Sequence, residues 1–148
     1  MKIVKPVSIG LVQETNKSNK IDQVIGRVTN DLKRQSLSIS KIAVWQVRSQ
    51  SAGIDVDLLH AKLINELVSS NSFQVISRHR LEELLKEQEL ALSGIMDEKS
   101  AVEIGGLIGV EGFLDGYAAL ENNQLSLTLH LIETKTGKIL WSTTAQSE

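Results

Sequence analysis

The side chains of this chain best suited to chemistry are histidines and carboxylates in segments with a helical pattern. His79 and Glu83 lie four residues apart, a spacing that puts two metal ligands on one helix face. No third ligand follows nearby, so a pair of surface side chains is the better interpretation. His60 and His130 have no adjacent carboxylate and serine that would indicate a hydrolytic triad. Carboxylates are frequent where helix starts and exposed faces are expected, but they lack the spacing of a metal-binding loop: Asp55, Asp57, Glu82, Glu83, Glu87 and Glu89. The sequence therefore predicts no catalytic residue, no metal site and no enzymatic activity.

Two glycine-containing stretches have some of the composition of phosphate-binding loops. Residues 105–112 (GGLIGVEG) end a predicted helix and precede a predicted strand, whereas phosphate loops follow a strand and open a helix. Helix termination and close packing of the helix on the sheet are the better interpretation. Thr136-Gly137-Lys138 resembles the end of a Walker motif, but Ile132 and Ile139 occupy the positions of the first glycine and of the hydroxyl residue. A hairpin turn is expected there, and no cofactor is predicted.

The composition is that of one globular domain, with 148 residues of which 41% are hydrophobic. The formal charge of -2 leaves no positive excess to bind a phosphate backbone, so nucleic acid is not an expected partner. No apolar run approaches the ~20 residues of a membrane-spanning helix, and the first residues lack a signal-peptide core. An exported protein would therefore carry its signal outside this sequence. Without cysteine, the chain is compatible with either redox compartment.

Hydrophobic periodicity predicts strands alternating with helices over the first two thirds of the chain. Residues 3–12 have a strand pattern, and Pro6 would place that strand at a sheet edge. Residues 41–47 (KIAVWQV) are apolar enough for a central parallel strand. The remaining predictions are helices at 20–34 and 55–70, a short strand at 73–76, a helix from Ser77 broken by Gly94, and a short helix ended by Gly109.

The last third changes to a period of two residues, which indicates strands with one buried face. Leucines at every second position from 125 to 131 predict the middle strand, flanked by strands at 113–120 and 139–145. The predicted fold class is α/β, one mixed sheet flanked by helices, βα-βα-βα-α followed by an antiparallel three-strand meander. We expect residues 1–148 to form one domain with its core in residues 41–148. Residues 1–36 would pack peripherally or be exchanged with a neighbouring copy, which leaves a homo-oligomer open.

A series of residues in fixed order, from Lys41 to the end, carries a family resemblance. It runs through IAVWQV, LINELVSSNSFQVISR, Leu81, Leu84, Leu85, Glu87, Gln88, Leu90, Ser93-Gly94, Asp97, Ala101, Ile104-Gly105, Leu107, Gly109-Val110-Glu111, Leu114, Gly116 and LIETKTGKI. This series resembles the CsgG-like family of bacterial envelope proteins, which includes accessory proteins of secretion, flagella and cell-wall synthesis. Two positions depart from the family pattern: Ser77 replaces an acidic residue before Arg78, and Gly109-Val110-Glu111 replaces the usual Gly-Ala-Asp.

The resemblance implies a set of residues that are structural or that contact a partner: Arg78, Leu81, Glu87, Gln88, Gly94, Asp97, Gly105, Gly109 and Gly116. Arg78, at a strand-to-helix junction, would hold Glu87, Asp97 or a C-terminal carbonyl through its forked donors, and a structural role is favoured over partner contact. Gly94 and Asp97 would form the turn and the cap between two helices, and the other three glycines would permit close backbone approach.

The resemblance further implies a non-enzymatic accessory or adaptor domain of the cell envelope that binds a protein partner in secretion, flagellar or cell-wall assembly. Its location would be periplasmic, with or without association with the outer membrane, although no lipid-bearing cysteine is present. A small-ligand or nucleotide-binding α/β module is the alternative, because such sheets offer clefts at the carboxyl ends of their strands.

Overall fold

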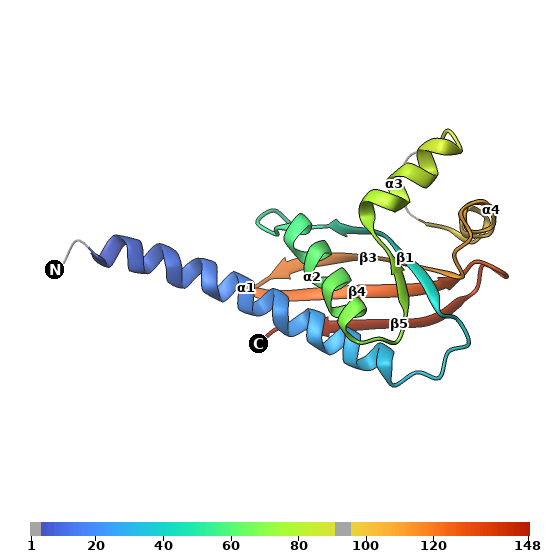
Figure 1. The fold of residues 1–148 in the computed structure, drawn as a ribbon. Helices are drawn as coiled ribbons and strands as arrows, with labels where there is room; N and C mark the ends of the chain where they lie inside the picture. The colour runs from blue at the N-terminus through green and yellow to red at the C-terminus, as the bar shows by residue number, and fades with distance from the viewer. Residues whose placement is uncertain (1–3, 91–95) are drawn as a thin grey trace.

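The fold is that of a computed structural model, which describes the backbone of residues 4–90 and 96–148 and the side chains from residue 19 onward within these ranges. Its elements in chain order are α1 (Val4–Lys33), β1 (Lys41–Ser49), α2 (Val56–Ser69), β2 (Gln74–Ile76), α3 (Arg78–Glu87), α4 (Glu98–Ile108), β3 (Gly112–Glu121), β4 (Gln124–Glu133) and β5 (Ile139–Gln146). The strands form one sheet in the order β2-β1-β3-β4-β5 (Figure 1). β1 is parallel to both neighbours, and β3, β4 and β5 are antiparallel. The predicted mixed sheet with a central parallel strand and a final meander is confirmed.

The predicted strand at residues 3–12 is wrong, because this segment belongs to α1, which begins at Val4. Pro6 lies in the first turn, where backbone N–H groups have no acceptor within the helix, so its missing N–H costs nothing there. The sheet consequently has one strand fewer than predicted. The amphipathic pattern at 20–34 was correct but covered only the C-terminal half of the helix.

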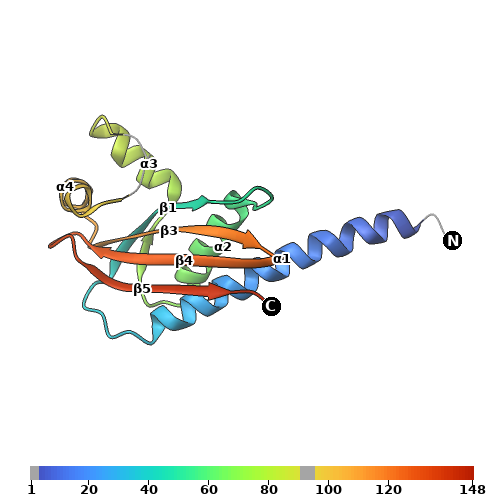
Figure 2. The same cartoon turned by 180° about the vertical axis from the view of Figure 1, so that it is seen from behind.

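Helices cover the two faces of the sheet differently. α1 and α2 lie across one face (Figure 1), and the opposite view shows β3, β4 and β5 without a helix over most of their length (Figure 2). The larger core lies under α1 and α2, where the side chains of both helices meet alternate residues of β1, β3, β4 and β5: Ile21, Val24, Ile25, Val28, Leu32, Ile42, Val44, Val47, Leu59, Leu63, Leu67, Leu114, Leu127, Leu129, Leu131 and Trp141. The four alternating leucines of β4 are buried in it, as predicted.

A second, smaller core lies on the opposite face beneath α3 and α4. Trp45 and Phe113 form its centre, with ring centroids 5.6 Å apart in an edge-to-face arrangement. β1 therefore contributes to both cores, which explains why four consecutive residues from Ile42 to Trp45 are buried.

The turns and helix ends follow the local chemistry of their residues. The hairpin between β3 and β4 places Asn122 and Asn123 at φ values of 50° and 63°, and Gly137 has φ 78° in the turn before β5, as predicted. α3 ends at Glu87, earlier than predicted. Glu89 takes a left-handed φ of 56°, and Leu90 N–H donates to the Leu85 carbonyl at 2.7 Å, the pattern of a Schellman motif. Gly94, the predicted helix breaker, lies outside the described residues.

Two adjacent glycines of α4 provide a matched pair for testing how closely this helix packs on the sheet. A Cβ at Gly105 would lie 2.3 Å from the Thr134 methyl carbon, whereas a Cβ at Gly106 would meet nothing within 4 Å. We expect Gly105→Ala to destabilise the fold by about 1–3 kcal/mol through overpacking. Gly106→Ala should stabilise it by about 0.5–1 kcal/mol, because alanine restricts the unfolded chain and favours helix. Urea unfolding followed by tryptophan fluorescence measures both, and equal effects would contradict the close contact.

Candidate functional site

The sheet is incomplete on the outer side of β1. β2 has three residues, which pair with Lys41, Ile42 and Ala43, whereas β1 continues to Ser49. Within the described ranges, no strand lies beside the outer edge of β1 beyond Ala43. The chain leaves this position at Ile76 and turns into α3, so the carboxyl-terminal half of β1 borders a space where a further strand would fit.

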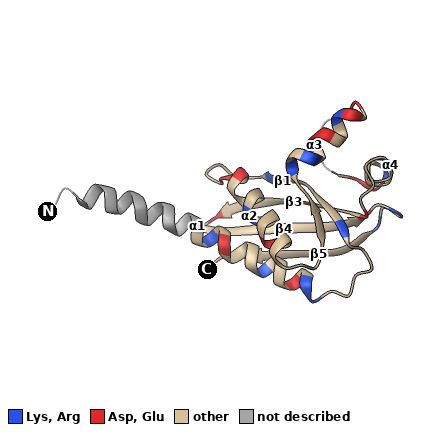
Figure 3. Ribbon diagram, viewed as in Figure 1, with Lys and Arg blue, Asp and Glu red and all other residues tan. Residues whose placement is uncertain are grey.

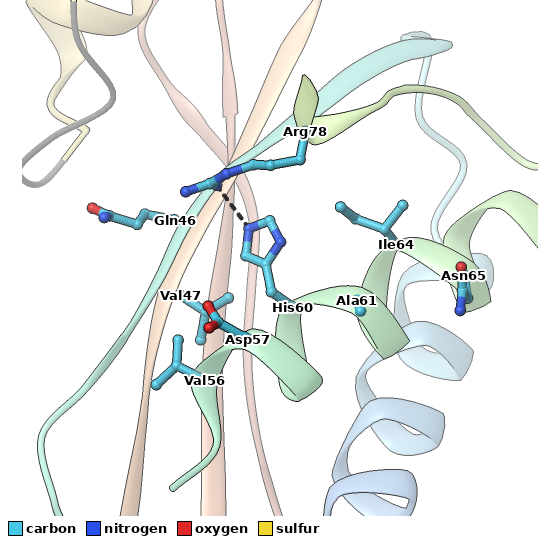
Figure 4. A pocket seen from close by; sticks show the side chains of 9 residues that line it. All are labelled: Gln46, Val47, Val56, Asp57, His60, Ala61, Ile64, Asn65 and Arg78. Atoms are coloured by element: carbon cyan, nitrogen blue, oxygen red, sulfur yellow. Dashed lines mark hydrogen bonds between the residues drawn. The ribbon is translucent and has the colours of Figure 1, made fainter. Parts of the chain in front are cut away.

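A groove of about 460 Å³ occupies this space, between β1 and α2 (Figure 4). Val47, Val56, Ala61 and Ile64 give it apolar walls. The polar side chains around it come from three elements: Gln46 from β1, Asp57, His60 and Asn65 from α2, and Arg78 from the start of α3. The groove therefore combines apolar walls with a polar rim, as ligand and peptide sites commonly do.

Arg78 closes one end of the groove. Its Nη1 donates to the Trp45 carbonyl at 2.8 Å and lies 3.0 Å from His60 Nε2, and its Nε lies 3.4 Å from Glu82 Oε1. The guanidinium thus takes the place of the strand N–H that would bind the Trp45 carbonyl if β2 were longer. The prediction that Arg78 holds Glu87 or Asp97 is wrong, because these residues lie at the far end of α3 and at the start of α4. The carbonyl that it binds lies in the middle of β1.

His60 is neutral in this arrangement. The residue is only 9% exposed. Burial lowers the pKa of His60 from 6.5 to about 4; the Arg78 guanidinium lowers it further, and the Asp57 carboxylate opposes the shift. Arginine has donors only, so His60 Nε2 must be the acceptor of the 3.0 Å bond and the ring proton lies on Nδ1. The pair is therefore a single positive charge, carried by Arg78, beside an uncharged ring.

A buried carboxylate that the sequence pattern did not single out lies on the neighbouring strand. Asp115 of β3 is 1% exposed and accepts two bonds from Arg48 of β1, at 2.8 and 3.4 Å. Its second oxygen also accepts from Met96 N–H at 3.2 Å. This fork ties β1 and β3 to the segment before α4. The available signal was one carboxylate within an otherwise apolar strand, FLDGY.

The other residues singled out from the family resemblance are dispersed and largely structural in their contacts. Leu81 is buried in the smaller core. Glu87 is the last residue of α3 and lies 3.9 Å from Arg80 Nη1, and Gln88 caps the helix. Asp97 caps α4 by accepting a hydrogen bond from Ser100 N–H at 2.7 Å, and hydrogen bonding to Ser100 lowers the pKa of Asp97.

The glycines among these residues are needed for different structural reasons. Gly109 ends α4 with a left-handed φ of 76°. A Cβ at Gly116 would lie 2.0 Å from the Thr128 carbonyl oxygen, so the strand pair β3–β4 admits only glycine there. Gly105 approaches Thr134 as described above. The residues of the family motif that the structure describes therefore do not converge on one site, and Arg78 is the one that lines the groove.

His79 and Glu83 form an exposed pair with 3.8 Å between Nε2 and Oε2. Across the described part of the chain, no three His, Asp or Glu side chains are grouped so that they could hold a metal ion. None of the helices in the same part is both long and apolar enough to span a bilayer.

The neutral state of His60 predicts a pH dependence of stability. Below pH 6.5 the unfolded chain binds a proton at this position, whereas the folded chain stays neutral there until about pH 4. The free energy of unfolding should therefore fall as the pH is lowered from 6.5 to 4, with a contribution from His60 of at most about 3 kcal/mol, and the fall should be smaller by that contribution in His60→Gln. Urea unfolding across this range measures it, with His79→Gln as an exposed control that keeps the wild-type slope. Equal slopes in wild type and His60→Gln would show that folding does not lower the pKa of His60.

Comparison with solved structures finds the same fold in other proteins. The C-terminal domain of LpoB from Escherichia coli superposes with a TM-score of 0.72 at 20% identity, covering 86% of this chain and 97% of that one. The LpoB C-terminal domain from Salmonella enterica gives 0.70 at 18% identity, covering 89% and 98%. Lipoprotein GNA1162 from Neisseria meningitidis gives 0.54 at 18% identity, covering 74% and 81%. At these identities the likeness establishes the fold.

Comparison of the sequence with curated proteins gives no match. Residues 40–126, more than half of the chain, match the family described as curli production assembly/transport component CsgG. The matched segment begins just before β1 and ends in β4, so it contains the incomplete sheet edge, the groove and the half-buried contacts of Arg48 and Arg78. This chain belongs to the CsgG family.

Proposed function

We propose that this chain is a non-enzymatic accessory domain of the bacterial cell envelope, which binds a protein partner in secretion, flagellar or cell-wall assembly. The observation that carries the proposal is the family match over residues 40–126, whose description is that of an assembly and transport component. The LpoB-like fold and the likeness to a lipoprotein support an envelope location, periplasmic and with or without attachment to the outer membrane.

Two surfaces of the described chain have the character that partner binding requires. One is the groove between β1 and α2. The other is the open face of the sheet, the part of β3, β4 and β5 on the side opposite α1 and α2 that lies beyond the cover of α3 and α4 (Figure 2). It has polar side chains already joined across the strands: Thr128 and Thr144 at 2.9 Å, and His130 and Ser142 at 2.9 Å. Lys and Arg are interspersed with Asp and Glu along the described helices (Figure 3).

A small-ligand or nucleotide-binding module is the second candidate, favoured by the groove itself. Its volume of about 460 Å³ lies in the range of small-molecule pockets. Native mass spectrometry of the purified protein distinguishes this candidate, because a retained ligand would add a defined mass that denaturation removes.

Photo-cross-linking in the producing cells tests partner binding. A photoreactive phenylalanine analogue at Asn65, beside the groove, or at Ser142, on the open face, should give an adduct with an envelope protein from at least one position. The same analogue at the exposed Lys138, in the turn before β5, is the matched control and should give none. Mass spectrometry identifies the adduct. If neither position captures an envelope protein, the proposed function is wrong.

We also propose that residues 1–148 form one domain, with α1 packed on its own sheet. Five apolar residues of α1 are buried in the larger core, and Lys62 of α2 lies 2.6 Å from Asp22 of α1. Because the chain has no cysteine of its own, the double variant Asp22→Cys and Lys62→Cys can be joined by a short bis-maleimide without a competing thiol. At high dilution we expect an internally linked monomer on a denaturing gel. A covalent dimer would show instead that α1 is exchanged between copies.

A further inference from the structure

The backbone of β1 presents hydrogen-bonding groups to the groove. Gln50 N–H donates to the Ala118 carbonyl of β3 at 2.8 Å, so Gln50 faces β3. Backbone groups of successive strand residues point to alternate sides, and the bulge of β1 lies earlier, between Val44 and Gln46. Val47 and Ser49 therefore direct their N–H and C=O groups away from β3, towards the side where β2 has ended. This edge has the donors and acceptors that an added strand needs.

The groove is closed at the end where β2 stops. β2 occupies the position beside β1 as far as Ile76, which pairs with Ala43. Arg78 follows at this closed end (Figure 4). The other end lies beside Val56 and Asp57, at the start of α2. A strand added along β1 must therefore stop at Arg78 or bend sharply out of the sheet. A peptide whose carboxyl terminus lies beside Arg78 meets no obstacle.

The charges of the groove favour a carboxylate at the closed end. Arg78 is the single cation among the described residues that line the groove. Its Nε faces the Glu82 carboxylate at 3.4 Å and its Nη1 is engaged by Trp45 and His60, whereas its Nη2 has no hydrogen-bond partner among the described residues and is left for a ligand carboxylate. The neighbouring His60 is neutral. Asp57 lies towards the opposite end and would repel a carboxylate placed there, which sets the direction of a bound peptide.

We propose that this groove binds the carboxyl-terminal residues of an extended partner peptide, which adds to the sheet antiparallel to β1. Its main chain pairs with Val47 and Ser49, and its terminal carboxylate accepts hydrogen bonds from Arg78. Side chains on one side of the peptide pack against Val56 and Ile64. The inference rests on the proposed function, since it names the kind of segment through which a partner protein is bound.

A peptide binding measurement tests the inference on the full chain. A pool of fluorescein-labelled decapeptides of random sequence with free carboxyl ends is screened by anisotropy. The strongest binder is then prepared as the acid, as the C-terminal amide and with two further residues at its carboxyl end. We expect the amide and the extended peptide each to bind at least about tenfold more weakly than the acid, because each loses the charge-assisted bonds at the closed end. This comparison changes only the peptide, so it does not depend on the folding of a variant.

Variants of the protein locate the contact. Arg78→Gln should lower the affinity for the acid about tenfold and abolish the preference for acid over amide. Arg80→Gln, two residues further along α3 and exposed, is the matched control and should bind as wild type does. Ser49→Pro removes one outward N–H at the open edge, where proline is tolerated, and should weaken the acid and the amide alike. Hydrogen exchange should show that the peptide protects the Val47 and Ser49 amides.

Three results would overturn the inference: acid and amide bind equally, protection is confined to the open face, or no peptide of the pool binds with a dissociation constant below about 1 mM. Should this happen while photo-cross-linking at Ser142 captures an envelope protein, the groove inference fails and the proposed function stands. If cross-linking captures nothing from either position, the proposed function fails as well.

Discussion

The structure depends on one strand that is buried on both faces and paired fully on one side only. β1 contributes to the larger core through Ile42, Val44 and Val47 and to the smaller one through Ala43 and Trp45. Its inner edge pairs with β3 along its length, but its outer edge has a strand beside it for three residues. A polar backbone edge within an apolar setting must be paired, hydrated or bonded to a side chain. The Arg78 guanidinium meets this need at the Trp45 carbonyl, and the groove exposes the rest of the edge.

Arginine suits this position because it provides several donors in one plane and stays charged. One nitrogen binds both the strand carbonyl and a histidine that burial holds in its neutral form. A lysine would supply a single donor atom to the same space. The family motif at Arg78 thus has a structural cause, and the same contact places a positive charge at the closed end of a groove. Structural support and partner binding need not be alternatives for this residue.

The buried carboxylate of Asp115 connects elements inside the fold and does not line the groove. Asp115 and Arg48 join the two central strands, and Met96 N–H binds the same carboxylate, so the connection between α3 and α4 is held to the sheet at its far end. The meander then extends the sheet with a polar open face on one side and a continuous leucine row on the other. The two candidate surfaces therefore lie on different parts of the sheet: the groove at the β1 edge beside α2, and the open face over β3 to β5.

Much of the architecture was determined by the sequence, because periodicity and turn chemistry are local properties. The leucines of β4, the asparagines after β3, Gly109 and Gly137 each specify their conformation within a few residues, and the structure confirms them. The predicted strand at residues 3–12 is wrong because Pro6, which fits an edge strand, fits the first turn of a helix equally well. The contacts of Arg78, the neutral state of His60 and the burial of Asp115 were decided by tertiary structure alone. They depend on residues that are distant in sequence and on how much water the packing removes, and no spacing along the chain records either.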